Sequence, residues 1–488
     1  MLMQACGGSE TGKPEEITAK NDPANAEMAA ETTADPYLDD LPDGLTLDGA
    51  AVTFLYREEV SDEFYTDTMN GDIVNDAIYE SIRNVEERLN ADVVLKTRAG
   101  HLLSARQDYK DHVTGTILAG DDLYDWVDLM FGAPPGLMVN GVFTDLHTVR
   151  YIDLDKPYYI SGLAETVSID GHLYFLGGDI SLGYLKCLHC LYFNKQVAEN
   201  YGIASLYDIV NDGQWTLDKM MEITEAACED LNGDGKYNME DKIGFLVHNS
   251  VHLKAFWIST GITMYALDSD GEYKFVFGSE RDATICNKLN QLIYQTKGTY
   301  YPEINDANDA QIEKYNNLAA KFKSGDVFIT TAEMDYAVSH LRDMEDSYGI
   351  LPFPKRDEEQ DAYVSSSRTT HNSFCMPVTC SDPDKAGAVM EALSSEKYSS
   401  VAPAYFEIAL KVKYAHDNES AVMYDLIRDT MFFDFGYTYN TAIGSPESTF
   451  TTSIKTQDSI ASTVASKGPA LQAKLDEYIA QVREGNRH

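Results

Sequence analysis

Residues 51–56 read Ala-Val-Thr-Phe-Leu-Tyr, and residues 92–97 read Asp-Val-Val-Leu-Lys-Thr. The stretch between them, at 72–90, repeats apolar residues at helical spacing, on a face formed by Val74, Ile78, Ile82, Val85 and Leu89. A helix near 109–118 and a third strand at 124–130 continue the alternation. Strands that alternate with helices predict an α/β fold with a mostly parallel sheet, whose ligands sit beyond the carboxyl ends of the strands.

The length and the charge of the chain limit its class. With 488 residues it is too long for one core, so two or more lobes are expected. The 38 Lys and Arg residues against 79 Asp and Glu residues give a net charge of −41. A surface this acidic repels phosphate backbones, so we predict no nucleic-acid partner and no direct binding to anionic membranes. No run of about 18 apolar residues occurs, so no transmembrane helix is predicted.

The N-terminal segment is typical of a surface anchor. Residues 1–9 read Met-Leu-Met-Gln-Ala-Cys-Gly-Gly-Ser, which resembles the end of a bacterial lipoprotein signal. Residues 7–47 are rich in Glu, Asp, Thr, Ala and Pro and are too polar to build a core. We therefore expect 1–47 to be a signal remnant and an acidic tether, with lipid on Cys6 as the link to the membrane. An ordinary N-terminal cysteine is the alternative.

Residues 230–241 have the spacing of a calcium-binding loop, with Gly235 at the sharp turn in position 6. The oxygen ligands would come from Asp230, Asn232, Asp234, Lys236 (its backbone carbonyl), Asn238 and Asp241. Position 12 is Asp rather than Glu, and the following residues 242–248 resemble a strand rather than a second helix. We therefore expect a structural Ca²⁺ and not a sensor. An acidic turn without a metal is the alternative.

Two shorter motifs bear on the second half of the fold. Thr216 is a candidate N-cap for an amphipathic helix, with Trp215 and Met220 as its hydrophobic staple. The stretch 187–190, Cys-Leu-His-Cys, is a CxxC, which occurs in disulfides, redox pairs and half zinc sites. No second CxxC completes a zinc site, and the segment is strongly apolar, so we interpret these cysteines as buried free thiols.

The middle of the chain predicts a crossover between lobes. Residues 172–179 are extended, and a strand at 190–195 enters a helix near Gln196. A helix that ends near Gly325 leads into a strand, and the segment 348–354 ends another strand with prolines. From Pro383 onward, the chain is predicted to be mainly helical.

A series of short segments gives a more specific interpretation. They are Tyr-Phe-Asn-Lys at 192–195, Asn-Tyr-Gly-Ile at 200–203, Gly-Gln-Trp-Thr-Leu-Asp-Lys at 213–219, the loop at 230–241 with Ile-Gly-Phe at 243–245, the Ser-Gly-Asp within 322–328, Gly-Ile-Leu-Pro-Phe-Pro-Lys at 349–355 and Ala-Pro-Ala-Tyr-Phe at 402–406. In this order they resemble extracellular solute-binding protein family 1, the carbohydrate-binding lipoproteins of ABC transporters. The resemblance covers about residues 50–435; no single segment is diagnostic, but the ordered set is a strong signal.

The resemblance implies a two-lobed periplasmic-binding-protein-like fold, in which each lobe is a mostly parallel sheet flanked by helices. Lobe 1 would comprise 48–178 and 330–378, and lobe 2 would comprise 179–329 and 379–488, with hinge crossings between them. The implied protein is not an enzyme. It would capture an oligosaccharide by hinge closure and deliver it to an ABC permease at the extracellular face of a bacterial membrane. A monomer is the simplest model.

Candidate ligand contacts follow from the chemistry of sugars, whose apolar faces stack on aromatic rings and whose hydroxyls bind carboxylates, amides and Arg. Positions after predicted strands, in the crossover and in polar or aromatic stretches supply the candidates, which are Tyr56, Arg57, Glu58, Phe131, Asp179, Trp257, Glu333, Met334, Tyr336, Arg368, His371 and Tyr439. Trp257, inside an apolar helix, is almost as well explained as a core residue. Trp126 and Trp215 are predicted to be structural.

Other functions remain open on the sequence alone. A secreted glycan-active enzyme with a dockerin-like calcium loop would need two facing carboxylates, and a dockerin would carry two such loops rather than one. No GxSxG, HExxH or P-loop motif occurs. A surface adhesion module and a binding protein for a peptide or another non-sugar solute are the remaining alternatives.

Overall fold

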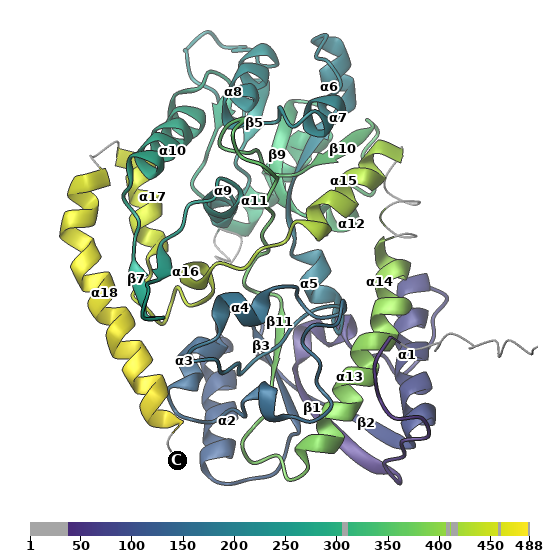
Figure 1. The fold of residues 1–488 in the computed structure, drawn as a ribbon. Coiled ribbons are helices and arrows are strands. Elements are labelled where there is room, and N and C mark those ends of the chain that lie inside the picture. The colour runs from purple at the N-terminus through teal and green to yellow at the C-terminus, as the bar shows by residue number, and fades with distance from the viewer. Residues whose placement is uncertain (1–37, 305–310, 407–409, 411–417, 457–459, 487–488) are drawn as a thin grey trace, which may run out of the picture. The chain divides into compact units, whose positions relative to one another are not determined.

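The first lobe is built on a four-stranded sheet in the order β11-β3-β1-β2 (Figure 1). In the computed structural model, the residues described are 38–304, 311–406, 410, 418–456 and 460–486. β1 pairs in parallel with β2 and β3, whereas β11 is antiparallel to β3. The strands are β1 (Ala50–Arg57), β2 (Ala91–Arg98), β3 (Trp126–Met130) and β11 (Asn372–Cys375).

Helices α1 (Ile73–Leu89) and α2 (Arg106–Leu118) connect the three parallel strands of this sheet. The Asp72 side chain accepts hydrogen bonds from the amides of Val74 and Asn75, which satisfies the free donors at the start of α1. Asn90, in the left-handed region with φ 47°, ends the helix. The expected strand–helix–strand unit is therefore confirmed, with apolar residues of α1 buried on the sheet.

The second lobe has a five-stranded sheet in the order β10-β4-β9-β5-β8. β5 is parallel to β8 and β9, but β4 is antiparallel to β9 and β10, so this sheet is mixed rather than mostly parallel. The β4–β9 register places His189 directly opposite Glu333. The strands are β4 (His189–Asn194), β5 (Ile243–Leu246), β8 (Thr299–Tyr300), β9 (Val327–Glu333) and β10 (Tyr348–Leu351), and a separate hairpin joins β6 (Tyr265–Leu267) to β7 (Tyr273–Phe275).

Further helices surround the sheets, and no strand follows β11 in the described part of the chain, in agreement with the predicted helical C-terminal region. The α-helices are α3 (Pro134–Met138), α4 (Leu163–Val167), α5 (Leu182–Lys186), α6 (Lys195–Asn200), α7 (Leu206–Asn211), α8 (Leu217–Ala226), α9 (Leu253–Ser259), α10 (Glu280–Asn290), α11 (Ile312–Lys323), α12 (Tyr336–Ser339), α13 (Pro383–Ser399), α14 (Val401–Pro403), α15 (Asn418–Asp429), α16 (Phe435–Thr438), α17 (Glu447–Thr456) and α18 (Ile460–Gly485). Short helical turns are η1 (Glu58–Glu63), η2 (Leu146–Thr148), η3 (Ser250–His252) and η4 (Gln291–Gln295).

The division of the chain between the lobes differs from the predicted one at two places. β9 and β10 belong to the sheet of lobe 2, although residues 330–378 were expected in lobe 1. Conversely, α13 packs against α1 and β1 of lobe 1, although 379–488 was expected in lobe 2. Both differences have one cause: strand pairing and helix packing across long sequence distances decide lobe membership, and local sequence patterns do not encode them.

The predicted local features of lobe 2 are confirmed. Thr216 Oγ1 accepts a hydrogen bond from the Lys219 amide at 3.3 Å and so caps α8. Trp215 is buried and donates from Nε1 to the carbonyl of Pro352 at 2.9 Å, which identifies it as structural. The six described cysteines are free, and no disulfide joins them. Cys6 lies outside the described residues.

Helix α18 contacts both lobes, and it runs along one side of the two sheets in Figure 1. On the lobe-2 side, Gln472 Oε1 accepts from the Phe275 amide of β7 at 2.7 Å. On the lobe-1 side, the Tyr478 hydroxyl donates to the Pro135 carbonyl at 2.9 Å, and Arg483 pairs with Asp170 at 2.7 Å. Pro469 lies inside the helix, just before Gln472 and these lobe-1 contacts. None of the described helices is long and apolar enough to cross a bilayer.

Candidate functional site

The carboxyl ends of parallel strands carry a polar cluster in each lobe. In lobe 1 the residues end β1, follow β2, lie within β3, and lie just before and at the start of β11, and we call Arg57, His101, Asp128, Thr370 and Asn372 the lobe-1 cluster. In lobe 2 they lie at the end of β9, after β5 and at the start of antiparallel β4, and we call His189, His252, Glu333 and Arg368 the lobe-2 cluster. In open α/β sheets, this edge is where ligands bind.

The lobe-1 cluster is a saturated ion-pair network. Arg57 and Asp128 are 1% and 0% exposed, and Arg57 Nε lies 2.7 Å from Asp128 Oδ2. Asn372 Nδ2 donates to Asp128 Oδ1 at 2.8 Å, and Arg57 Nη1 donates to the Thr370 carbonyl at 3.1 Å. Burial lowers the pKa of Arg57, but the attraction of Asp128 outweighs it and raises the pKa above the ordinary value. The guanidinium therefore stays charged within the lobe.

His101 joins this network as a neutral partner. Its Nδ1 lies 3.1 Å from Arg57 Nη1. Burial, followed by repulsion from Arg57 and Arg106, lowers the pKa of His101 to about 4. At neutral pH its imidazole therefore carries no charge, and its Nδ1 can accept from the guanidinium.

A cavity of about 230 Å³ opens at the same strand ends. Three cationic side chains line this cavity, and no carboxylate occurs among the described lining residues. The polar side chains of the lining include Arg57, Arg106, Lys110, Thr369, Thr370 and Thr441. In a chain of net charge −41, this is a locally basic surface. Two larger hollows, of about 660 Å³ and 710 Å³, lie beside α18 and beside α11, away from both clusters.

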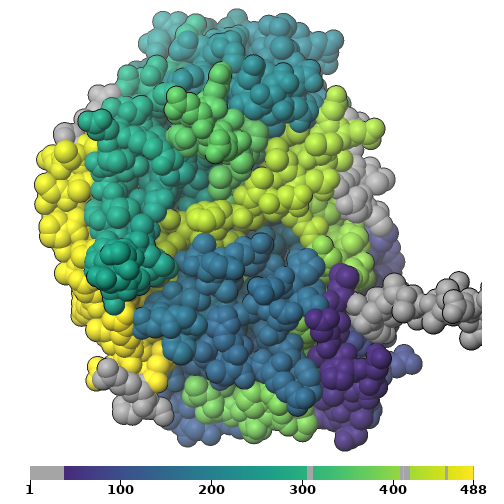
Figure 2. Space-filling view, viewed as in Figure 1, coloured from purple at the N-terminus to yellow at the C-terminus, as the bar shows by residue number. Residues whose placement is uncertain are grey.

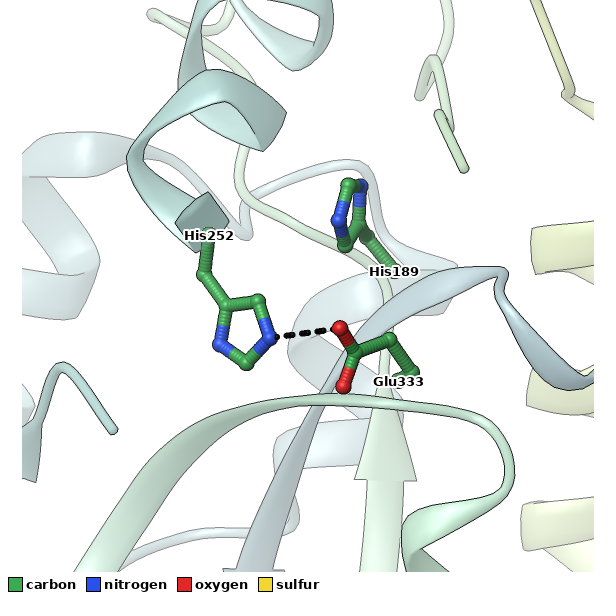
Figure 3. A group of neighbouring side chains, drawn as sticks. All are labelled: His189, His252 and Glu333. Atoms are coloured by element: carbon green, nitrogen blue, oxygen red, sulfur yellow. Dashed lines mark ion pairs between the residues drawn. The ribbon is translucent and has the colours of Figure 1, made fainter. Parts of the chain in front are cut away.

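The lobe-2 cluster gathers residues from distant parts of the sequence (Figure 3). His252 Nε2 lies 3.0 Å and Arg368 Nη1 3.4 Å from Glu333 Oε1. Burial raises the pKa of Glu333, but the surrounding His252, Arg368 and His189 outweigh it, and the pKa falls well below its usual range. Burial, with a contribution from His252, lowers the pKa of His189 to about 3. Glu333 is therefore an anion and His189 a neutral base.

One chain segment, residues 366–372, connects the two clusters. At its start, the His189 amide donates to the Ser366 carbonyl at 2.8 Å. At its end, the amides of Gly132 and Phe131 donate to the carbonyls of Thr369 and His371 at 3.1 Å and 2.8 Å. The segment is thus anchored to lobe 2 by one end and to lobe 1 by the other, which is the arrangement expected of a hinge crossing.

A second link between the lobes is an ion pair. Arg428 of α15 lies 2.8 Å from Asp179, which belongs to the crossover that follows lobe 1. Burial raises the pKa of Asp179 to about 6, although Arg428 opposes the rise. In the space-filling view of Figure 2, the yellow-green segment that contains α15 lies between teal lobe-2 residues and blue lobe-1 residues.

Solved structures with the same arrangement of two lobes and crossings are numerous, and 549 chains match. The galacto-N-biose-/lacto-N-biose I-binding protein of an ABC transporter from Bifidobacterium longum, in complex with lacto-N-biose, aligns over 91% of this chain and 99% of its own, with a TM-score of 0.55 and 13% identity. The chain has the fold of a two-lobed binding protein.

Two other solved structures support the same conclusion about the binding-protein fold. An ABC substrate-binding protein from Listeria monocytogenes in complex with cycloalternan covers 89% of this chain and 100% of its own, with a TM-score of 0.51 and 12% identity. UgpB from Mycobacterium tuberculosis in complex with glycerophosphocholine covers 88% and 100%, with a TM-score of 0.58 and 14% identity. No protein-family model and no curated protein matches the sequence. At these identities, the likeness shows the fold alone.

Within the binding-protein fold, the twelve sequence-predicted contacts fall into three groups. Two are brought together in the lobe-2 cluster, since Glu333 and Arg368 form an ion pair. Arg57 lies in the lobe-1 cluster and lines the cavity, and Glu58 follows it as an exposed residue of η1. The structure places the other eight in buried packing, and they are Tyr56, Phe131, Asp179, Trp257, Met334, Tyr336, His371 and Tyr439.

The buried aromatic candidates have identifiable packing partners. Tyr56 stacks on Phe64 with ring centres 5.2 Å apart, and Phe131 stacks on His371 at 4.5 Å. Trp257 lies 6.1 Å from the ring of Tyr437 and has no accessible surface. These side chains stabilise the lobes in the structure as it stands, so a direct ligand contact from them remains a prediction.

Three histidines of the clusters were not among the predicted contacts. His101 lies in a loop without a recognisable motif, and His252 lies in a short polar stretch, 248–252, between two apolar segments. His189 lies inside the CxxC motif, which was interpreted from its two cysteines alone. The available signal for His189 was a histidine within an otherwise apolar stretch. A buried imidazole needs partners for both ring nitrogens, so such a residue indicates a polar cluster.

Proposed function

We propose that this chain is the extracellular solute-binding receptor of an ABC transporter, and that it captures an oligosaccharide between its lobes. The observation that carries the proposal is the two-lobed binding-protein fold over about nine-tenths of the chain, shared with solved structures that bind lacto-N-biose and cycloalternan. The residues at the facing strand ends supply hydroxyl, guanidinium and carboxylate groups, which suit a rim of sugar hydroxyls.

Native mass spectrometry of freshly purified protein tests this proposal, followed by calorimetric titration with a panel of oligosaccharides. We expect a retained or added neutral glycan mass and a binding isotherm with one site. No retained solute, no calorimetric signal and no thermal shift with any glycan would contradict the sugar assignment. Release of product from a natural or chromogenic glycan would instead favour the enzyme alternative.

A solute with an anionic group is the second candidate, because three cations and no carboxylate line the described cavity. Lys110→Ala removes one of these charges. The matched control is Lys96→Ala, which removes an exposed lysine of β2. An anionic solute would bind roughly tenfold more weakly to the first variant than to the control, and increasingly weakly as salt rises. Equal affinity of both variants for every anionic solute tested would exclude this candidate.

We further propose that Cys6 carries the lipid anchor, that residues 1–37 act as a tether, and that a monomer delivers its ligand to the membrane subunits of the permease. The predicted tether, 1–47, was too long: residues 38–47 pack on lobe 1, where Leu41 and Leu47 are buried and Asp39 pairs with Arg88 at 2.7 Å. The sequence around Cys6 and the acidic composition of the tether support this layout. Metabolic labelling with a radioactive fatty acid tests it, with Cys6→Ser as the control. Labelling that persists in Cys6→Ser would place the lipid elsewhere.

The loop 230–241 is proposed to hold a structural Ca²⁺. In its favour, Asp230 accepts from the amides of Gly233 and Gly235 at 2.6 Å and 2.8 Å, which folds its carboxylate into the loop. Asn232 and Asp234 make the same kind of turn with following amides. Asp241 accepts from the amides of Leu231 and Asn238, and lone pairs on its oxygens remain for an ion. The ion would supply rigidity at the edge of lobe 2 and no contact with the ligand.

A further inference from the structure

Three side chains of the lobe-2 cluster have the composition of a transition-metal site. His189, His252 and Glu333 each offer one ligand atom, and the three atoms lie within 4.8 Å of one another. The cross-strand register of β4 and β9 places His189 opposite Glu333, and η3 brings His252 to the same carboxylate (Figure 3). Because the positions are set by paired strands rather than by a surface loop, the group is held in place by the fold.

Two imidazole nitrogens in this group have unmet bonding capacity. His189 is 1% exposed; its Nδ1 lies 2.9 Å from Ser366 Oγ, while its Nε2 has no hydrogen-bond partner among the described residues. His252 Nε2 lies 3.0 Å from Glu333 Oε1, yet it too makes no hydrogen bond within the described chain. His252 Nε2 and Glu333 Oε1 are therefore close together but do not point at each other. Two ligand atoms of one metal ion have the same arrangement.

The spacing of the rings agrees with a shared ion. The ring centres of His189 and His252 are 5.6 Å apart, at an interplanar angle of 71°. Two imidazoles bound through Nε2 at zinc distances and a tetrahedral angle have ring centres about 5 Å apart. The 3.0 Å between His252 Nε2 and Glu333 Oε1 is close to the separation of neighbouring ligands in such a site, about 3.3 Å.

Hydroxyl groups hold the two rings from behind. His189 Nδ1 faces Ser366 Oγ, and His252 Nδ1 faces Thr331 Oγ1 at 2.8 Å. Thr331 Oγ1 already accepts from the His248 amide, and its remaining lone pair can accept the Nδ1 proton of His252. With Nδ1 protonated, Nε2 presents a lone pair toward Glu333. Outer contacts of this kind orient the histidines of metal sites.

We propose that His189, His252 and Glu333 bind a first-row transition-metal dication, with zinc as the best match to two imidazoles and one carboxylate. Three protein ligands leave a coordination position for water or for an oxygen of a bound solute. The competing arrangement is a metal-free network, in which Arg368 and His252 surround the carboxylate of Glu333. The proposal is independent of which solute the cleft captures.

The test uses untagged protein that has been stripped with a chelator and returned to buffer with excess Ca²⁺, so that calcium occupies carboxylate sites. Zinc or cobalt(II) alone is then the probe. We expect one zinc per chain by elemental analysis, and visible absorption of bound cobalt typical of low coordination number. His189→Ala and Glu333→Gln should each lower zinc affinity roughly 100-fold or more, whereas the exposed His147→Ala should not.

Circular dichroism and the thermal transition establish that each variant is folded. If His189→Ala does not fold, Ser366→Ala removes only the outer contact, and a fall of roughly 10–100-fold in zinc affinity supports the site. X-ray absorption of the zinc-loaded wild type gives a second readout, with two imidazole scatterers expected. Zinc binding no tighter in the wild type than in the variants, or a zinc shell without imidazole, would leave the metal-free network as the correct description.

Discussion

In the lobe-1 cluster, the buried Arg57 is bonded at each of its three nitrogens, to Asp128, His101 and the Thr370 carbonyl. In the lobe-2 cluster, the equally buried His189 uses one ring nitrogen and leaves the other without a partner. Both clusters lie at the carboxyl ends of strands, yet one is complete by itself and the other is not. Burial therefore accompanies a complete polar network in lobe 1 and a network with an open imidazole nitrogen in lobe 2.

The largest effect is expected for Asp128→Asn, because this substitution leaves the charge of Arg57 buried without a counter-ion. We expect the free energy of unfolding to fall by about 3–5 kcal/mol. Urea titration followed by far-ultraviolet circular dichroism measures it. The matched control is Asp108→Asn, which breaks the exposed pair with Arg98 and should cost under about 1 kcal/mol. Equal losses in both variants would show that lobe 1 does not depend on this network.

The stability of lobe 1 is expected to depend on pH through one buried carboxyl group. Glu391 of α13 accepts from the hydroxyls of Tyr158 and Tyr159, and burial raises its pKa to about 7 from an ordinary 4.5. Between these values, the folded state binds the proton that the unfolded state has lost, so stability falls as pH rises from about 4.5 to 7. The change is about 3 kcal/mol at most.

Glu391→Gln should remove this part of the pH dependence, because an amide does not titrate. Chemical denaturation at several pH values between 4.5 and 7 provides the measurement, with the exposed Glu87→Gln as the control. A slope that is the same in Glu391→Gln and in the wild type would mean that the carboxyl is ionised throughout the range.

Calcium removal tests whether lobe 2 gains stability from an ion outside either cluster. At a calcium concentration 100-fold above the dissociation constant, the bound ion would add about 2.7 kcal/mol to the free energy of unfolding. A calcium-selective chelator should therefore lower the melting temperature of the wild type. It should have a smaller effect on Asp234→Asn, which lacks one ligand charge. Identical melting curves with and without chelator would remove calcium from loop 230–241.

The smallest effect is expected in the lobe-2 cluster itself. Glu333 and Arg368 are 13% and 18% exposed, so water screens their pair more than it screens Arg57 and Asp128. In metal-free protein, Glu333→Gln should cost about 1–2 kcal/mol by urea titration, less than Asp128→Asn. If it costs more, the lobe-2 cluster is a structural core like that of lobe 1, and the contrast between the lobes fails.

The sequence predicted elements that have local causes. The β1–α1–β2 unit follows from apolar periodicity and the Asp72 cap, and the start of α8 follows from Thr216. The antiparallel entry of β4 into the second sheet was not predictable, because Tyr192 and Thr330 pair across a long stretch of chain. The same pairing decides that β9 belongs to lobe 2.

The candidate site was predicted less well, for a geometric reason. Positions after predicted strands gave Arg57 and Glu333, and a polar stretch gave Arg368, and these three lie in the two clusters. Successive side chains of a strand point to opposite faces, however, so Tyr56 and Met334, next to two of these, turn into the cores. His252 reaches Glu333 only through tertiary packing, which no sequence spacing encodes.

Helix α18 affects how freely the two lobes can move against each other. It is bonded to the β6–β7 hairpin through Gln472, near its middle, and to lobe 1 nearer its end, and Pro469 interrupts its backbone ladder just before these contacts. Rotation of one lobe against the other would have to flex this helix, so elastic energy in α18 adds to the free energy of solute capture. A chain cut before Ile460 would then differ from the full chain in its closing equilibrium, even with every solute contact unchanged.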